Sequence, residues 1–282
     1  MTDYTHNFEA DTGKILNIVI NSLYSDRDIF LRELLSNASD AIHKRKLLGQ
    51  TNQSLLNTSD DQIEVTVDAK KKTINVTDTG IGLDEAELAQ TLGTIARSGT
   101  SSFLEDIGDL EDGKDAAKTL IGKFGVGFYS AFMLAERVEV RTRSFSDEQG
   151  WVWESTGDGS FTISEPAESL EHGTEIRLHL KKDLGEFTDP SRLKYILRKY
   201  STFVPHAIKV DGEHINDQPP IWVEPKSTVT EEQYQNFFEY LTHFPGQKAQ
   251  WHLHLTADSP FQFHSILYCP DANLERMGFG KS

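Results

Sequence analysis

RDIFLRELLSNASDAIHKRK, residues 27–46, is the stretch around which the rest of the chain is organised. Its apolar side chains recur at three- and four-residue steps, which is helical periodicity: Leu31, Leu34, Leu35, Ala38 and Ile42. Glu33, Asn37, Asp40 and Lys44 then share the opposite face. One interpretation is an ordinary amphipathic helix with a solvated polar face. The other is a carboxylate acting as a base one turn from an amide that binds a metal ion.

Composition favours a globular protein that does not grip nucleic acid. The chain has 282 residues, 37% hydrophobic and 26% charged, which suits two domains or one large one. Its formal net charge is −16, whereas binding to a phosphate backbone needs a concentrated basic surface. We therefore expect no nucleic-acid partner, although a local pocket for one nucleotide remains compatible with this charge.

Cysteine content and hydropathy indicate a cytoplasmic protein. Cys269 is the single cysteine and cannot form an intramolecular disulfide. Residues 1–14 are polar and acidic and do not resemble a secretory signal. No apolar run is long enough to span a bilayer, so we expect no membrane partner.

The order of predicted elements indicates an α+β fold. A helix is expected over 11–24, and Ser25 or Asp26 should cap the helix that follows. Strands are further expected at 63–67, 73–77, 138–143, 151–155, 160–163, 174–180 and 208–210. A short helix should begin with a capping box of Asp84 and Glu87, and Asp189-Pro190 should open a longer one. These predict a two-layer α/β sandwich, with helices on one face of a mixed, mostly antiparallel sheet.

Two segments punctuate this pattern. Residues 93–121 have poor periodicity and many glycines and serines, which is typical of a functional lid. Residues 216–229 are rich in proline and predict a linker between a domain at 1–215 and a second α/β unit at 230–282. That second unit should contain a helix at 231–241 and strands at 251–255 and 261–267.

Three further motifs suggest nucleotide chemistry. Asp78 ends a strand and is followed by Gly80 and Gly82, so that backbone can approach a ligand beside an acceptor-only carboxylate. The glycines of GKFGVG at 122–127 precede an expected apolar helix and could offer N–H groups to phosphates. Gly173-Thr174 begins a strand. Each alone is also compatible with an ordinary turn, hinge or strand start.

In this order the stretches resemble the four nucleotide-binding boxes of the ATPase superfamily that contains gyrase B, the ninety-kilodalton heat-shock chaperones, histidine kinases and MutL. Longer matches resemble the bacterial type of those chaperones: YSDRDIFLRELLSNASDA at 24–41, LGTIARSGT at 92–100 and GKFGVGFYSAF at 122–132. The likeness covers about residues 4–215, with a weaker middle-domain likeness from 218 onward.

The resemblance implies a role for each matched residue. Glu33 would activate the water that attacks the γ-phosphate, Asn37 would ligate Mg²⁺, and Asp78 would read the adenine amino group, helped by Thr174 through water. The remaining implied ATP- or ADP-binding residues are Asp40, Ala41, Gly80, Gly82, Leu83, Arg97, Ser98, Gly99, Gly122, Phe124, Gly125, Val126, Gly127 and Phe128. Residues 93–121 would close over the nucleotide, and residues 6–10 would form a strand that exchanges between protomers.

The resemblance also implies a longer protein with further domains. These chaperones usually carry Lys where this chain has Arg97, so a γ-phosphate role for Arg97 stays open. The γ-phosphate-contacting arginine of the middle domain and the C-terminal dimerisation domain would lie beyond Ser282. We therefore expect a chaperone fragment that binds Mg-ATP or Mg-ADP but hydrolyses weakly, acting in the full-length homodimer on unfolded or partly folded client proteins. The alternatives are another ATPase of this superfamily, of the gyrase B, MutL or histidine kinase kind, and a nucleotide-gated binding module without turnover.

Overall fold

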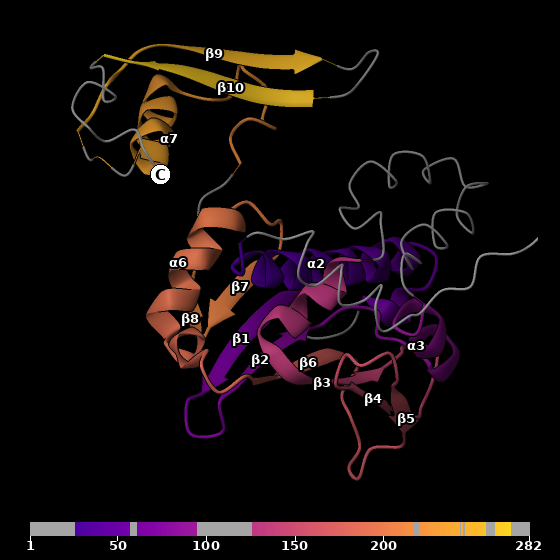
Figure 1. Cartoon of the computed structure of the whole chain (residues 1–282). Coiled ribbons are helices and arrows are strands. Elements are labelled where there is room, and N and C mark those ends of the chain that lie inside the picture. The colour runs from indigo at the N-terminus through magenta and orange to yellow at the C-terminus, as the bar shows by residue number, and fades with distance from the viewer. Residues whose placement is uncertain are drawn as a thin grey trace, which may run out of the picture. The chain divides into compact units, whose positions relative to one another are not determined.

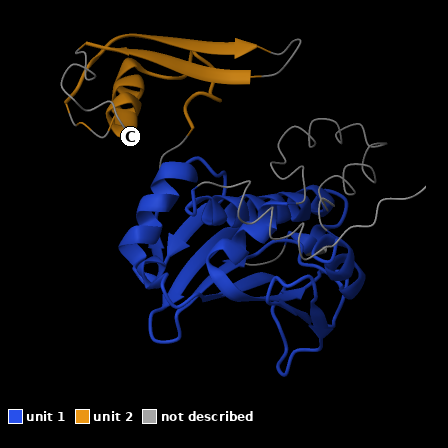
Figure 2. Cartoon of the chain, in the orientation of Figure 1, with its two compact units in different colours: residues 1–217 blue, residues 218–282 orange. Residues whose placement is uncertain are grey.

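The computed structural model describes residues 26–56, 61–94, 126–216, 220–242, 244, 246–257 and 263–271. The chain divides into two compact units, residues 1–217 and 218–282 (Figure 2). The expected helix at 11–24, the expected exchanging strand at 6–10 and all but two residues of the expected lid lie outside the described residues. The linker and domain assignments therefore stay predictions.

The helix predicted from residues 27–46 is α2, which spans Ile29–Gly49. Its buried apolar stripe is the predicted one with Phe30 added: Phe30, Leu31, Leu34, Leu35, Ala38 and Ile42, each at most 3% exposed. The predicted cap is wrong, because the N-cap residue is Asp28 and its side chain makes no capping hydrogen bond. Asp26 instead accepts a hydrogen bond from the backbone N–H of Asp28 at 3.0 Å, which orders the turn before the helix.

The first unit is built on an eight-stranded sheet with the order β5-β4-β3-β6-β2-β1-β7-β8 (Figure 1). The strands are β1 Gln62–Asp68, β2 Thr73–Asp78, β3 Ala135–Arg143, β4 Trp151–Ser155, β5 Thr162–Ser164, β6 Gly173–Leu180, β7 Ala207–Val210 and β8 Glu213–His214. Among the strand pairs of this sheet in the described residues, only β1–β7 is parallel. The predicted mixed, mostly antiparallel sheet is confirmed.

One face of this sheet forms the core and carries the helices. Alternate residues of the central strands turn toward α2, as period-two burial requires: Val65, Ile74, Val76, Val138, Val140 and Leu178 are all at most 1% exposed. Helix α6, Pro190–Tyr200, adds Leu193, Ile196 and Leu197 to the same core. The predicted two-layer α+β class is therefore confirmed.

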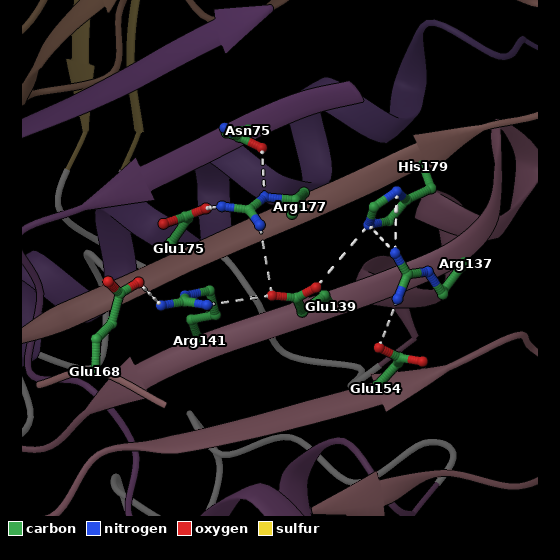
Figure 3. A network of polar contacts seen from close by, with 9 residues as sticks. All are labelled: Asn75, Arg137, Glu139, Arg141, Glu154, Glu168, Glu175, Arg177 and His179. Carbon is green, nitrogen blue, oxygen red and sulfur yellow. Dashed lines mark hydrogen bonds and ion pairs between the residues drawn. The ribbon is translucent and has the colours of Figure 1, made fainter. Parts of the chain in front are cut away.

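The other face of the sheet carries a network of charged side chains (Figure 3). Glu139 lies at its centre, with one carboxylate oxygen 3.6 Å from both Arg141 and Arg177 and the other 3.9 Å from His179. Outer members extend the network across four strands and the loop before β6: Asn75, Arg137, Glu154, Glu168 and Glu175. This face is half-buried and polar, so the nucleotide-type motifs belong to the opposite, helix-bearing face.

Five short elements of the described chain confirm or add to the sequence-based expectations. Helix α3, Glu85–Thr91, has the capping box expected from Asp84 and Glu87. The apolar helix expected after the glycine motif is a 3₁₀ helix, η2, over Gly127–Met133. Its residues from Phe128 to Phe132 are buried on all sides, so no amphipathic period was available to define the helix type. Two further 3₁₀ turns, η1 Gln53–Leu55 and η3 Gly185–Thr188, and the strand β8 had not been predicted.

The second unit contains α7, Glu231–Thr242, and a hairpin of β9, Ala249–Ala257, with β10, Phe263–Pro270. Tyr234 of α7 joins the helix to the hairpin, since its hydroxyl lies 2.7 Å from Nδ1 of His254 and its carbonyl accepts from Tyr268 at 3.0 Å. The opposite hairpin face exposes apolar side chains: Trp251, Leu253, Phe263 and Leu267. In the described part of both units, no helix combines the length and apolarity needed to cross a membrane.

Candidate nucleotide-binding site

The site is built where α2 runs beside the end of β2. The backbone N–H of Ile81 donates to the carbonyl of Ala41 at 3.1 Å, which ties the turn after β2 to the middle of the helix. Asp78, at the end of β2, is 5% exposed and accepts a hydrogen bond from the N–H of Gly80 at 2.8 Å through Oδ1. The first and second sequence motifs, forty residues apart, are thus brought together.

The fourth motif lies in the same cross-strand row as Asp78. In the register of the sheet Asp78 of β2 is opposite Thr174 of β6, and Thr174 is opposite Thr142 of β3. Residues directly opposite one another point to the same face of a sheet. Asp78, Thr174 and Thr142 therefore form a line of polar groups on the helix-bearing face, otherwise lined by aliphatic side chains.

Burial makes Asp78 an unusual carboxylate. Loss of hydration raises the pKa of Asp78 to about 7, opposed by the hydrogen bond from Gly80 and by the positive charge of Arg45. Arg45, on α2, is 3% exposed and forms an ion pair with Asp61. A neutral-pH pKa on a buried acid is typical of functional sites.

Gly82 shapes the turn after Asp78. Its φ of +71° is in the left-handed region, and a Cβ there would lie 2.0 Å from the carbonyl oxygen of Arg143. The next residue, Leu83, donates its N–H to Oγ1 of Thr142 at 3.0 Å, and Phe145 donates to the carbonyl of Ile81 at 3.1 Å. Only glycine lets the turn pack this closely against the end of β3.

Glu33 lies on α2 against the start of η2. Its Oε1 accepts from the guanidinium of Arg32 at 2.6 Å, and its side chain is 21% exposed. A Cβ added to Gly127 would lie 2.2 Å from Glu33 Oε2, so the last glycine of the third motif touches this carboxylate. The carboxylate predicted as a base is therefore a neighbour of Gly127, which lies in the described part of the loop predicted to hold phosphates.

The remaining polar side chains of α2 continue along the same face. Asn37 is half-buried and Asp40 is 4% exposed. Burial lowers the pKa of the Lys44 ammonium, an effect opposed by the negative charges of Asp40 and Glu87. Among the described residues no group of three or more His, Cys, Asp or Glu side chains could hold a metal ion. An amide ligand completed by phosphates and water is nevertheless a donor set that Mg²⁺ accepts.

Part of the predicted site falls outside the described residues: Arg97, Ser98, Gly99, Gly122, Phe124 and Gly125. Phe128 is described, and its ring packs edge-on against Trp153 with centroids 5.5 Å apart. Val126 is partly buried and precedes η2.

Three residues in this region were not found from the sequence: Arg32, Arg45 and Thr142. Arg32 and Arg45 belong to no recognisable motif, and in the sequence they cannot be told from ordinary solvent-exposed charges on a helix. Thr142 had a signal, because it continues the inward alternation of Val138 and Val140 along β3.

This arrangement defines a class of protein. The family described as "Histidine kinase-, DNA gyrase B-, and HSP90-like ATPase" matches residues 24–187, which include α2, the Asp78 turn and Thr174. The chain therefore belongs to this family of ATPases. Membership implies that it binds a nucleotide.

Within that family the likeness is to the heat-shock chaperones, as expected from the sequence. The family "Hsp90 protein" matches residues 208–279. The chain is 43% identical to the chaperone protein HtpG of Oleidesulfovibrio alaskensis over 279 residues, 98% of this chain and 43% of that protein. It is 44% identical to HtpG of Roseobacter denitrificans over 268 residues, 94% of this chain and 42% of that protein. The chain thus spans less than half the length of these curated relatives.

Proposed function

We propose that the first unit binds ATP and ADP with Mg²⁺ and hydrolyses ATP, as the nucleotide-driven part of a molecular chaperone. The observation that carries this proposal is the convergence of Asp78, Thr174 and the polar face of α2 at one end of the sheet. A second carboxylate, Glu33, lies on that same helix against Gly127. One acidic group can then read the base while the other serves the phosphate chemistry.

Asp78 reads the adenine base in this proposal. One of its oxygens is occupied by the N–H of Gly80, which fixes the carboxylate plane and leaves the other for the exocyclic amino group. Gly82 lets the base lie against the turn, and Ala41 and Leu83 border the same turn. Because Asp78 is buried, a hydrogen bond from the base is made away from competing water.

Glu33 acts as the general base for hydrolysis. It accepts a proton from water as the water oxygen attacks the γ-phosphorus, and the bond to the β–γ bridging oxygen breaks to give ADP and phosphate. Arg32 holds one carboxylate oxygen, and the other faces the Gly127 backbone. The proton is taken up at the oxygen on the phosphate-loop side.

Asn37 ligates Mg²⁺, which supplies positive charge to the phosphates. Its amide lies one turn after Glu33 on α2, and Asp40 follows on the same face. Asp40 borders the ribose and phosphates. The predicted residues outside the described ranges belong to this proposal as lid and phosphate-loop contacts: Arg97, Ser98, Gly99, Gly122, Phe124 and Gly125.

The whole protein is proposed to be a cytoplasmic ATP-dependent chaperone acting on unfolded or partly folded clients as a homodimer. Support comes from the relatives named chaperone protein HtpG and from the match of residues 208–279 to the Hsp90 family. In this proposal residues 1–215 are the ATP-binding domain, 93–121 its lid, 216–229 a linker and 230–282 the start of a middle domain.

Calorimetric titration with ADP and Mg²⁺ tests the proposal. The wild-type chain should bind, and Asp78→Asn should remove binding, because the amide oxygen is held by the N–H of Gly80 and the amide N–H₂ then faces the amino group of the base as a second donor. Asp68→Asn is the matched control. Asp68 lies at the opposite end of the β1–β2 hairpin from Asp78, and its carboxylate accepts a hydrogen bond from the N–H of Lys71. Omitting Mg²⁺ should weaken wild-type binding more than it weakens binding to Asn37→Ala. Equal binding by wild type and Asp78→Asn would refute the assigned base site.

A further inference from the structure

We infer that Thr142 is a positioning residue that orients the Thr174 hydroxyl as a hydrogen-bond acceptor, so that the base site prefers 6-aminopurines to 6-oxopurines. This inference rests on the proposed nucleotide site and adds the determinant of its base preference. Thr142 itself makes no direct contact with the base in this arrangement. It acts through Thr174 and through the turn at Leu83.

Thr142 is a buried residue that forms hydrogen bonds to both the turn after the second motif and the fourth motif. It is 1% exposed and lies opposite Thr174 in the β3–β6 register. Its hydroxyl donates to the carbonyl of Gly173 at 2.9 Å, and its Oγ1 accepts the N–H of Leu83 at 3.0 Å. The same oxygen lies 3.1 Å from Oγ1 of Thr174.

The hydrogen count of one hydroxyl decides the direction of the last contact. A threonine hydroxyl has one proton and two lone pairs. The proton of Thr142 goes to Gly173, and one lone pair receives the N–H of Leu83. Only a lone pair remains for Thr174, so Thr174 must donate its proton to Thr142. The Thr174 lone pairs are then left for whatever lies on its other side.

Because Thr174 donates its proton to Thr142, the base site presents hydrogen-bond acceptors from both Thr174 and Asp78. Thr174 is directly opposite Asp78, which also offers only acceptor oxygens when it is ionised. An amino group on the purine, or a water bridging to it, can donate to both residues. A carbonyl at the same purine position would face lone pairs, which leaves buried polar groups unpaired and is strongly disfavoured.

The decisive experiment measures ADP and inosine diphosphate on Thr142→Val, which keeps the side-chain shape and removes the hydroxyl. Freed from Thr142, the Thr174 hydroxyl can rotate and donate to a carbonyl. We expect ADP affinity to fall by about tenfold, the effect of about one buried hydrogen bond. Inosine diphosphate affinity should stay within about twofold of wild type or improve. The site is less preorganised without the Thr142 hydroxyl, but the freed Thr174 hydroxyl can now donate to the purine carbonyl, which offsets that loss. The ADP preference should therefore collapse.

Two further variants separate positioning from general damage. Thr142→Ser keeps the hydroxyl and should restore the wild-type preference. Thr73→Val removes a threonine hydroxyl that is also buried, 5% exposed, at the opposite end of β2, and should change neither affinity. An equal loss for both nucleotides in Thr142→Val would show a merely structural role. An unchanged preference would overturn the inference as well.

Thr174→Val guards against failure of Thr142→Val to fold. It leaves the bonds of Thr142 to Leu83 and Gly173 in place and removes only the hydroxyl pair. It must also lower the ADP preference, and an unchanged preference would refute the inference.

A ligand-free measurement distinguishes failure here from failure of the proposed function. The Leu83 amide should exchange its hydrogen about tenfold faster in Thr142→Val than in wild type or Thr142→Ser. Unchanged exchange would refute the role of Thr142 even if ADP binds. If wild type does not bind ADP but Leu83 exchange responds as expected, the proposed function fails, whereas the hydrogen bond from Leu83 to Thr142 that sets the direction of the Thr174 contact stands.

Discussion

Asp78→Asn should make the protein more stable while it removes ADP binding. The substitution is isosteric, and Oδ1 of an asparagine can still accept from Gly80. What it removes is a negative charge in a 5%-exposed position, where burial has raised the carboxyl pKa from 3.8 to about 7. At about 1.36 kcal/mol for each pKa unit, a shift of about three units corresponds to about 4 kcal/mol as an upper limit.

The sign of the pH dependence follows from proton uptake. The folded state binds a proton at Asp78 more tightly than the unfolded state, so stability falls as the pH rises from about 4 to about 7 and is level above that. Asp78→Asn lacks this loss. Its advantage over wild type should therefore grow by about 2–3 kcal/mol between about pH 5 and about pH 8.

Urea denaturation followed by circular dichroism at several pH values measures this difference. Burial lowers the pKa of His206 to about 4, which raises stability with pH over the same range. That contribution is present in both proteins and cancels in the comparison. Asp68→Asn should show no gain in stability, because the hydrogen bond from the Lys71 N–H lowers the pKa of the Asp68 carboxyl in the wild-type protein. A pH-independent difference, or a less stable Asp78→Asn, would refute the reasoning.

Three other outcomes follow from the site. ADP affinity should weaken below about pH 7, by up to about tenfold per pH unit, because the base needs the ionised Asp78; a flat calorimetric profile would contradict this. Arg45→Leu should move the midpoint of that profile upward, since Arg45 favours the charged form. Gly127→Ala should slow ATP turnover by about 10- to 100-fold, with ADP affinity within about threefold, because its Cβ displaces the flexible carboxylate of Glu33. Steady-state phosphate release tests the last expectation, which fails if affinity drops as much as turnover.

Local patterns in the sequence predicted the helix and the β1–β2 hairpin well. The stripe from Leu31 to Ile42 has one periodicity and is buried as a unit, and the alternating residues of β2 indicate which face is inward. Such patterns report the face of an element but carry no information about its neighbour in the sheet. The insertion of β6 between β2 and β3, and the parallel pairing of β7 with β1, therefore had to come from the structure.

The candidate site shows the same division. Asp78 and Gly82 were identifiable only together with the other motifs, because an acid at a strand end followed by spaced glycines is by itself also typical of an ordinary turn. Thr142 was not, since a single threonine in a strand is common and its partners are Leu83 and Thr174, fifty-nine and thirty-two residues away. Its role depends on hydrogen-bond direction, which no spacing rule expresses.

The position of β6 in the sheet has a consequence for synthesis of the protein on the ribosome. β1 and β2 can close as a hairpin early, but the free edge of β2 receives its partner only when residues 173–180 have left the exit tunnel. β7 must follow before β1 gains its parallel neighbour. A nascent chain therefore holds Asp78 on an unpaired strand edge for about a hundred residues of translation, and contacts so distant in sequence form slowly. A bound nucleotide cannot stabilise the β1–β2 hairpin at this stage, because the row of residues that binds the base is completed only when Thr174 of β6 pairs opposite Asp78.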